Sequence, residues 1–332
     1  MKRILIIQTA FTGDVVLATA LIEKLHEFYP QTPIDFLLRK GNEGLLDNHP
    51  YISKLWVWNK KNNKIANLLK IAFAIRKQRY SHVINVHRFA TSGLVCLLSG
   101  ANNIIGFKKN PLSWCFTQKC NHVISSPGSA VFVHETERNQ LLIEALTNKL
   151  PALPKLYPSQ HDYKKIAPYQ SQPYICIAPA SVWFTKQYPA NQWIKLINHF
   201  PLHVKIYLLG GPGDAPLTQL IKAFNKGKLV EDLCGQLSYL QSAALMQGAI
   251  INYTNDSAPL HFASSMNAPL KAIFCSTVPA FGFGPLRENG SVIQVNENLS
   301  CRPCGLHGKK ACPHGHFNCA MNITLQQLYD GL

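Results

Sequence analysis

The chain has 332 residues, long enough for two domains, and 47% of them are hydrophobic, which is enough for a sizeable core. Its 33 Lys and Arg against 17 Asp and Glu give a net charge of +16, which excludes a strongly anionic surface and indicates an anionic partner: nucleic acid, a membrane surface or an acidic substrate. Residues 1–165 hold 22 basic and 10 acidic residues (+12), and residues 166–332 hold 11 and 7 (+4), so the basic character belongs mainly to the first half.

Two further features bear on the cellular location. The apolar run at residues 4–7 is too short for a secretory signal, and the uncharged stretch 89–107 is interrupted by polar residues, so it is a poor membrane span. Ten cysteines without a signal favour reduced thiols or a metal site over a disulfide framework. We therefore expect a cytoplasmic protein.

Short apolar runs alternate with helical spacing along the first half. Apolar residues from Val15 to Leu25 recur at helical intervals, and Pro30 follows the predicted helix. Strands are expected at 4–7, 33–40, 54–59, 81–87 and 102–107, with helices at 14–28 and 62–79.

A second series follows residues 150–173, whose Pro-rich, polar composition is typical of an interdomain linker. The strand-bearing segments are 174–179, 204–214, 248–257 and 269–274, and helices are expected from about 191 to 199, up to about 225 and from about 259. Two such halves predict an α/β protein with two Rossmann-like domains, 1–165 and 166–332, facing each other across a cleft.

The first strand is followed by Thr12-Gly13-Asp14, not by the G-x-G-x-x-G turn of a dinucleotide site. Asp14 would repel a phosphate at this helix start. One interpretation is a first-turn acid matched to the helix dipole, worth roughly 0.5–2 kcal/mol. The other is a general base.

The second half holds the better anion site. Gly210, Gly211 and Gly213 follow an apolar strand, although turn geometry alone would explain them. In Asn255-Asp256-Ser257 a strand ends, and a helix begins near Pro259, so free amides there favour a diphosphate. The alternative is a capped helix with His261 packed inside. Lys186, in a loop between strand and helix, is either solvated or a point charge for a leaving diphosphate.

These motifs, in this order, resemble the ADP-heptose:lipopolysaccharide heptosyltransferases, glycosyltransferase family nine. The segments that carry the resemblance are TGD after the first strand, KQYPANQW (186–193), GGPGD (210–214) and NDSAPLHFAS (255–264), with VHRFATSG (86–93), IGFKKNP (105–111) and HETERN (134–139) similar to acceptor-domain segments. The resemblance covers nearly the whole chain and implies a GT-B fold.

The resemblance also implies roles for particular residues. Asp14 matches the family's general base, Lys186 its phosphate-binding lysine, and Asp256 the acid that holds the donor sugar. The implied donor-binding residues are Ser181, Gly211, Asp214, Asp256, Ser257, Ala258, Pro259 and His261, and the implied acceptor-binding residues are Thr12, Gly13, Arg88, Lys108 and Arg138. Ala258 stands where many members have Gly, and Asn85 where many have Asp.

The implied reaction is inverting transfer of a heptose or similar sugar from an ADP-sugar, which is a substrate rather than a cofactor, to the inner core of lipopolysaccharide. The chain has no Asp-x-Asp pair, so Lys186 and the helix start after Asp256 would take the electrostatic role of a metal. The basic cluster Lys60, Lys61, Lys64, Lys70, Arg76, Lys77 and Arg79 would meet phosphorylated core or the anionic inner face of the inner membrane, or is simply a solvated helix face.

The C-terminal segment places Cys301, Cys304, Cys312 and Cys319 as C-x2-C-x7-C-x6-C among three histidines. That spacing is compatible with zinc, but the second pair is not C-x2-C, and we favour a compact loop with reduced thiols.

Two other classes of function stay open. One is a related enzyme of the same fold that uses another nucleotide sugar or another cell-surface glycan. The other is a zinc-containing nucleic-acid-binding protein, which we place last because it leaves the Thr-Gly-Asp and Asn-Asp-Ser turns unexplained.

Overall fold

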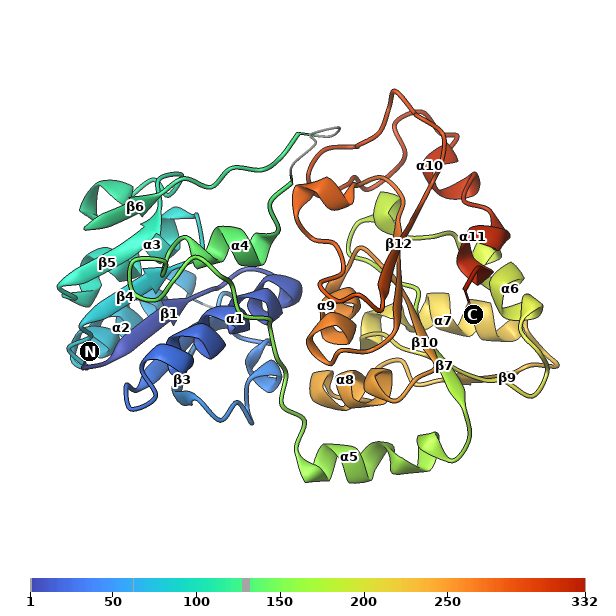
Figure 1. Ribbon diagram of the computed structural model, residues 1–332, viewed down its shortest axis with the longest axis horizontal. Helices are drawn as coiled ribbons and strands as arrows, with labels where there is room; N and C mark the ends of the chain where they lie inside the picture. Colours follow the sequence, from blue (N-terminus) through green and yellow to red (C-terminus); the bar gives the residue numbers. More distant parts are fainter. Residues whose placement is uncertain (1, 62, 127–131, 332) are drawn as a thin grey trace. The chain divides into compact units, whose positions relative to one another are not determined.

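The computed structural model describes residues 2–61, 63–126 and 132–331. Its internal contacts divide the chain into two units (Figure 1). Unit 1 comprises Met1–Ile124 and Val133–Tyr157, and unit 2 comprises Ser125–Phe132 and Pro158–Leu332. Each unit is built on one six-stranded sheet whose strands all run parallel.

The sheet of unit 1 has the order β3-β2-β1-β4-β5-β6. Its strands are β1 (Ile4–Ile7), β2 (Ile34–Arg39), β3 (Ile52–Trp58), β4 (His82–Asn85), β5 (Asn103–Phe107) and β6 (Gln118–Cys120). Its helices are α1 (Thr12–Phe28), α2 (Lys64–Arg76), α3 (Ala90–Ser99) and α4 (Glu135–Gln140), with short 3₁₀ turns at Glu43–Leu45 and Ser113–Cys115. The strand order reverses at β1, so the loops after β1 and β4 leave its carboxyl edge in opposite directions.

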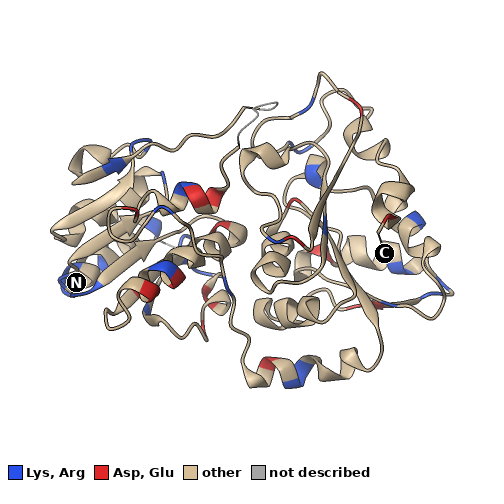
Figure 2. Cartoon of the chain, viewed as in Figure 1, with Lys and Arg blue, Asp and Glu red and all other residues tan. Residues whose placement is uncertain are grey.

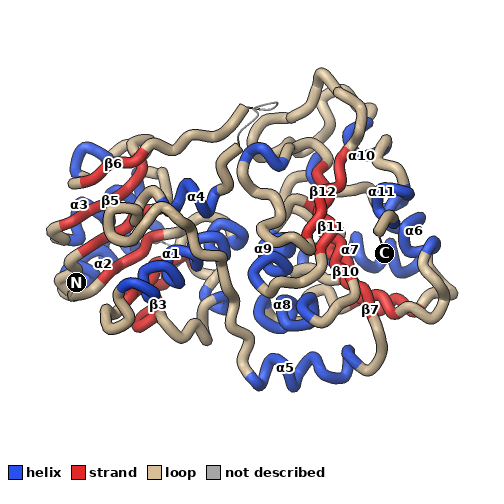
Figure 3. The backbone as a smooth tube through the Cα atoms, viewed as in Figure 1, coloured by secondary structure: helices blue, strands red, loops and turns tan. Residues whose placement is uncertain are grey.

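The sheet of unit 2 has the order β12-β11-β10-β7-β8-β9 and reverses at β7 (Figure 3). Its strands are β7 (Tyr174–Ala178), β8 (Lys205–Leu208), β9 (Leu229–Asp232), β10 (Ile251–Asn255), β11 (Leu270–Phe274) and β12 (Gly290–Gln294). Its helices are α5 (Gln160–Ile166), α6 (Ala190–His199), α7 (Ala215–Ala223), α8 (Tyr239–Gln247), α9 (Ala258–Ser265), α10 (Asn318–Met321) and α11 (Leu325–Tyr329), with 3₁₀ turns at Ala167–Gln170, Phe184–Lys186, Pro212–Asp214 and Pro279–Phe281.

Most of the elements expected from apolar spacing are present. β1 occupies residues 4–7 as predicted, whereas α1 begins at Thr12, two residues before the expected start. The helix expected at 62–79 is α2, residues 64–76; residue 62 lies outside the described residues. α3 is not among the predicted elements, because its apolar residues 94–98 form one consecutive run and do not recur at helical intervals.

The expected linker and the domain division at 165 differ from the structure. Residues 150–173 are not a continuous linker, because they contain α5, and this helix groups with unit 2. The reason is packing on α8: Tyr163 Oη donates to Gln247 at 2.8 Å, and Gln241 donates to Asp162 at 3.2 Å. Residues 158–165 therefore belong to the second unit, together with 125–132.

The C-terminal segment completes the core of unit 2. Cys319, Ala320, Ile323 and Leu328 are buried in one cluster with Trp193 of α6. The carbonyl of Leu328 accepts from the hydroxyl of Tyr253, on β10, at 2.8 Å. The tail is thus part of the folded unit. In the part of the chain that the structure describes, no helix combines the length and the hydropathy needed to cross a membrane.

A buried polar network connects β2 and β3 of unit 1 to the residues that precede β1 and β4. The carboxylate of Asp35, on β2, is fully buried and accepts from Arg3 Nε and Nη2, each at 2.9 Å. It also accepts from the hydroxyl of Tyr80, which in turn accepts from Trp56 Nε1 at 2.9 Å. Burial, and then the bond to Asp35, raises the pKa of Tyr80, so its hydroxyl stays protonated and keeps donating.

This network generates a stability prediction. Tyr80→Phe leaves a buried carboxylate and the Trp56 indole each without one partner, so we expect a loss of about 1–3 kcal/mol in the free energy of unfolding. Tyr163→Phe is the matched control, because its hydroxyl bond lies on a partly exposed side chain. Thermal unfolding monitored by circular dichroism measures both variants. Equal shifts in the two midpoints would show that the network contributes no more than a surface bond.

Candidate functional site

Asp14 stands in the first turn of α1, directly beyond the carboxyl end of β1. Its Oδ2 accepts from the backbone N–H of Phe11 at 3.2 Å, so the carboxylate does cap the helix. The side chain is only half-buried. Capping therefore uses one oxygen, and the other keeps its lone pairs for another donor.

The pKa of Asp14 is raised to about 6. Burial is the largest cause, and the negative charge of Glu135 is the second. The N–H of Phe11 and the positive charge of Arg88 act in the opposite direction. A carboxylate with this pKa is ionised at neutral pH and is a stronger base than an ordinary aspartate.

Glu135, in α4, belongs to a chain of charged side chains. It lies 3.2 Å from His122 Nε2 and accepts from Arg138 Nε at 2.7 Å. Arg88 Nη1 lies 3.2 Å from His122 Nδ1. Because a guanidinium only donates, His122 Nδ1 must accept, so Nε2 carries the proton that is donated to Glu135. Burial by itself would raise the pKa of Glu135, but His122 and Arg138 lower it below its usual range. Glu135 therefore stays anionic beside Asp14.

The strand ends next to Asp14 add a second group of polar residues. Lys60 Nζ donates to the carbonyl of Thr9 at 2.7 Å, and Thr9 Oγ1 lies 3.0 Å from His87 Nδ1. Burial, and then the charges of Arg39 and Lys64, lowers the pKa of Lys60 to about 8. Burial, and then Lys60 and Arg88, lowers the pKa of His87 to about 4, so this imidazole is neutral at pH 7.

Some of the expected acceptor residues lie near Asp14, and others are engaged elsewhere in unit 1 or exposed. Arg88 and Asp14 are within electrostatic reach of each other. Thr12 donates to Asn42 at 3.1 Å, next to Gly13 in the first turn of α1. Arg138 is 1% exposed and paired with Glu135, so its guanidinium is engaged within unit 1. Lys108 is exposed beyond the end of β5.

In unit 2, Lys186 and Asp256 form an ion pair at the carboxyl edge of the sheet. Lys186 Nζ lies 2.8 Å from Asp256 Oδ2, with both side chains largely buried. Thr277, beyond β11, donates to the same oxygen at 2.6 Å. An ammonium has three N–H donors, so one pairing leaves two for phosphate oxygens. The pair therefore orients the lysine without using up its hydrogen-bonding capacity.

The C-terminal tail holds the Lys186 loop in place. The backbone N–H of Thr185 donates to the carbonyl of Lys309 at 3.1 Å, and the N–H of Lys309 donates back to Thr185 Oγ1 at 2.8 Å. Ser276 donates from its hydroxyl to the same Oγ1 at 2.9 Å. Gly308 has φ +78°, and a Cβ there would meet Lys186 Cγ at 3.0 Å. Sequence spacing drew attention to the tail cysteines, whereas these backbone contacts are what connect the tail to the lysine.

The start of α9 follows Asp256 directly. Ser257 is the N-cap residue in extended conformation, its side chain makes no capping bond, and a proline occupies the first turn. Pro259 has no N–H, and the N–H of Leu260 donates to the carbonyl of Ser257 at 3.1 Å, so the N–H of Ala258 is the first-turn amide left for an anion. Ser257 and Ala258 are half-buried with Pro259, while His261 is 4% exposed and its ring meets Phe283 edge-on at 6.4 Å.

The other expected donor residues are engaged locally. Asp214 Oδ2 accepts from the N–H of Gly211 at 2.8 Å, and the N–H of Asp214 donates to the carbonyl of Gly211 at 2.9 Å. A Cβ at Gly210 would lie 3.0 Å from the Asp214 side chain, which explains this glycine without a ligand. The carbonyl of Ser181 accepts from Gln187 at 2.8 Å and so shapes the Lys186 loop.

The tail cysteines lie close enough to influence one another. Burial raises the pKa of Cys319 to about 12, followed by the charge of Cys304, while Arg302 acts in the opposite direction. All ten cysteines are free thiols. Among the residues that the structure describes, no group of three or more His, Cys, Asp or Glu is placed to hold a metal ion.

Arg302 fixes the tail to the strand ends. Its guanidinium donates to the carbonyls of Cys275 at 2.7 Å, Phe274 at 3.1 Å and Thr277 at 2.7 Å. Thr277 is the residue that donates to Asp256. Sequence reasoning does not predict this contact, because Arg302 and Thr277 are 25 positions apart and no motif links them.

Two curated proteins are similar to this chain over most of its length. Lipopolysaccharide heptosyltransferase 3 of Escherichia coli is 26% identical over 283 residues, covering 80% of this chain and 82% of that protein. Lipopolysaccharide heptosyltransferase 1 of Campylobacter coli is 25% identical over 295 residues, covering 83% and 84%.

The solved structure of the E. coli ADP-heptose lipopolysaccharide heptosyltransferase II has a TM-score of 0.78 at 21% identity, covering 99% of this chain and 96% of that one. This likeness, together with the two parallel α/β sheets, confirms the predicted GT-B fold with two Rossmann-like domains. The sequence model described as glycosyltransferase family 9 (heptosyltransferase) matches residues 68–313. Since that match spans most of the chain, the protein belongs to glycosyltransferase family 9 and is a glycosyltransferase.

Proposed function

We propose that this enzyme transfers a heptose, or a similar sugar, from an ADP-sugar to the inner core of lipopolysaccharide, with inversion and without a metal. The observation that carries the proposal is Asp14: a half-buried carboxylate at the carboxyl edge of a Rossmann-like sheet, with its pKa raised to about 6. An inverting transfer needs a base that removes the proton of the acceptor hydroxyl as it attacks the anomeric carbon. Asp14 is that base, and Thr12 and Gly13 border the acceptor.

Unit 2 supplies the donor side. The leaving diphosphate gains negative charge as the glycosidic bond breaks, and Lys186 and the free first-turn amide of α9 stabilise it. Asp256 holds the donor sugar and, through its 2.8 Å ion pair, keeps the lysine in position. These groups replace the charge that a metal would provide, so no metal or other cofactor enters the proposed reaction.

The donor and acceptor follow from the names of the relatives. Two curated relatives are named lipopolysaccharide heptosyltransferases, and a protein of the same fold is named as using ADP-heptose. The alternative, another nucleotide sugar or another cell-surface glycan, makes the same use of Asp14 and Lys186. It differs only in pocket side chains, so a comparison of ADP-, UDP- and GDP-linked donors by calorimetry distinguishes the two.

Unit 1 suits an anionic acceptor at a membrane surface. Residues 48–134 contain 12 Lys and Arg and no Asp or Glu. Figure 2 marks the basic residues of the chain in blue and the acidic ones in red. On α2, the exposed apolar side chains Ile65 (69%) and Phe73 (54%) lie among exposed Lys70 and Lys77. An apolar strip with flanking cations is typical of a helix at a lipid interface. We propose a cytoplasmic enzyme that contacts the anionic inner face of the inner membrane through α2.

The base assignment is tested by Asp14→Asn. Asparagine can still accept from Phe11 but cannot take a proton, so we expect the transfer rate to fall at least about 100-fold while donor affinity is unchanged. The matched control is Asp162→Asn, because Asp162 accepts from the N–H of Ser159 at 2.8 Å in the same first-turn position of α5. A radiolabelled transfer assay measures both variants. Turnover of the Asp14 variant within a few-fold of wild type would exclude Asp14 as the base.

The pH dependence gives a second, independent check on Asp14. The ionised form is active, so kcat/KM should rise with pH through about 6 and level off above it. Stability should move in the opposite direction: because the folded pKa is raised, the contribution of the neutral carboxyl is complete below about pH 4 and is lost as the pH rises through about 6. Asp14→Asn should therefore be at least as stable as wild type at pH 8. A pH profile without a transition between 5 and 7 would contradict the assignment.

Lys186→Met tests the donor side. Removing the ammonium leaves Asp256 unpaired and the diphosphate without its point charge, so we expect donor affinity to fall about tenfold or more, together with kcat. Lys195→Met, an exposed change on α6, is the control. Both are assayed with EDTA present and absent, and wild-type activity should be the same in each. Loss of wild-type activity in EDTA, restored by a divalent cation, would contradict the metal-independent mechanism.

A further inference from the structure

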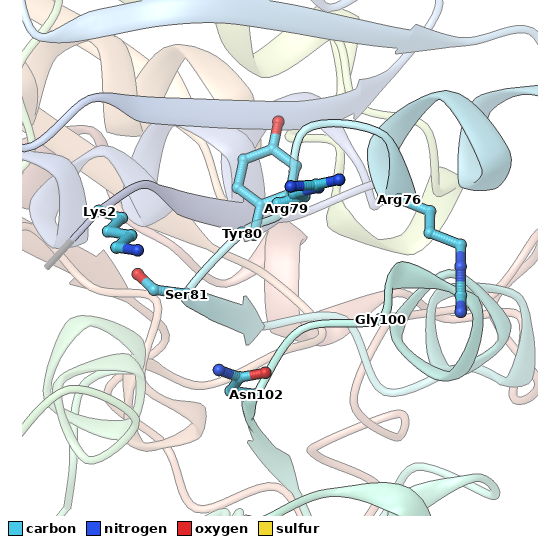
Figure 4. A pocket seen from close by; sticks show the side chains of 7 residues that line it. All are labelled: Lys2, Arg76, Arg79, Tyr80, Ser81, Gly100 and Asn102. Atoms are coloured by element: carbon cyan, nitrogen blue, oxygen red, sulfur yellow. The ribbon is translucent and has the colours of Figure 1, made fainter.

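A cavity lies in unit 1, at the opposite edge of the sheet from Asp14. Its volume is about 820 Å³. It is lined by Lys2, Arg76, Arg79, Tyr80, Ser81, Gly100 and Asn102 (Figure 4). Gly100 lies between α3 and β5. These residues precede β1, β4 and β5 or end α2, so the cavity sits at the amino ends of the strands. Lys2 and Ser81 lie at one side of it and Arg76 at the other.

The charge of this cavity is uncompensated. Three of its lining residues are cationic, none is acidic, and residues 48–134, which supply most of the walls, contain no Asp or Glu at all. Arg76 is partly engaged, because its Nη1 lies 3.4 Å from the carbonyl of Leu98 at the end of α3. The side chains of Lys2 and Arg79 make no hydrogen bond or ion pair with the residues that the structure describes. Cations gathered in this way repel one another unless an anion lies between them.

The backbone of Arg79 has a left-handed conformation that residues with a side chain rarely adopt. Its φ is +54°, in the left-handed region where glycine or asparagine is usual. A glycine at this turn would be less strained, yet the position carries a cation that faces the cavity. Strained residues of this kind cluster at ligand sites.

The cavity wall is rigid. Tyr80 contributes its ring, and its hydroxyl is fixed by Asp35 and by Trp56 in the buried network described above. Asp35 is the nearby carboxylate, and it is already paired with both Arg3 and Tyr80. It is therefore not available to neutralise Lys2 or Arg79.

We propose that this cavity is a phosphate-binding site, in which Lys2, Arg76 and Arg79 bind a tetrahedral phosphate group and the side-chain amide of Asn102 offers a hydrogen bond to it. The hydroxyl of Ser81 lines the site but donates to the carbonyl of Arg3 at 2.9 Å. Guanidinium groups donate in pairs to phosphate oxygens, and the lysine adds a point charge. The phosphate is either that of a lipid headgroup or a free one. The site goes beyond the proposed glycosyl transfer, because it lies across the sheet from the carboxyl edge where Asp14 stands.

The experiment compares wild type with Lys2→Gln/Arg79→Gly. The glycine suits φ +54°, so this variant should fold at least as well as wild type. Lys222→Gln/Lys226→Gln, which removes two exposed charges from unit 2, is the matched control. Inorganic phosphate is titrated by calorimetry into each protein, and Lys186→Met separates binding at the donor side from binding in the cavity. We expect the cavity variant to lose at least tenfold in phosphate affinity, while the control and Lys186→Met retain a wild-type cavity site.

Vesicles distinguish the two sources of phosphate. Sedimentation measures binding of each protein to vesicles of phosphatidic acid in phosphatidylcholine and to vesicles of phosphatidylcholine alone. A lipid headgroup is supported if wild type binds the phosphatidic acid vesicles, inorganic phosphate displaces it, and the cavity variant does not bind. Calorimetric binding of inorganic phosphate without such displacement supports a soluble phosphate in the same site. Equal phosphate affinity of wild type and Lys2→Gln/Arg79→Gly, or no phosphate binding beyond that removed by Lys186→Met, would overturn the proposal. A transfer defect in Asp14→Asn would be unaffected by either result, so the two proposals fail independently.

Discussion

The structure depends on one constraint: in an all-parallel sheet every strand must be reached by a crossover, so all carboxyl ends share one edge. In unit 1 that edge brings together the loops after β1 and β4, and with them Asp14 and Arg88. In unit 2 it brings together the loops after β7, β10 and β11, and with them Lys186, Asp256 and Thr277. Residues 74 positions apart (Asp14 and Arg88) and 91 positions apart (Lys186 and Thr277) are thereby brought into two compact groups.

The two groups treat their charges in opposite ways. Burial raises the pKa of Asp14, and so does the nearby anion Glu135, whose own charge is maintained by His122 and Arg138. Lys186 is instead paired with an acid, which fixes the position of its ammonium. A base gains from a raised pKa, whereas a phosphate-binding cation gains from being fixed and permanently charged. The difference in environment therefore matches the difference in the proposed roles.

The C-terminal tail contributes through its backbone as well as its cysteines. Lys309 and Thr185 exchange two hydrogen bonds, Gly308 packs on Lys186, and Arg302 joins three carbonyls at the strand ends. Cys319 and its neighbours are buried in the core of unit 2. The tail thus couples the core of the unit to the geometry of its most important cation, and a change in tail packing is expected to reach Lys186.

Local sequence determines the positions of most strands and helices in this protein. Four-residue apolar runs and helical spacing located β1, α1 and most of the elements that followed, because burial on both faces of a parallel sheet demands continuous apolar strands. Local sequence placed Asp14, Lys186 and Asp256 in turns after such strands but left more than one interpretation open, and their predicted roles came from the resemblance to glycosyltransferase family nine. Sequence reasoning could not find α3, place α5 on α8, or show that Arg138 and Asp214 are already engaged. Those outcomes, and the pKa of Asp14, arise from side chains brought together across the chain, and only the tertiary structure decides which charges become neighbours.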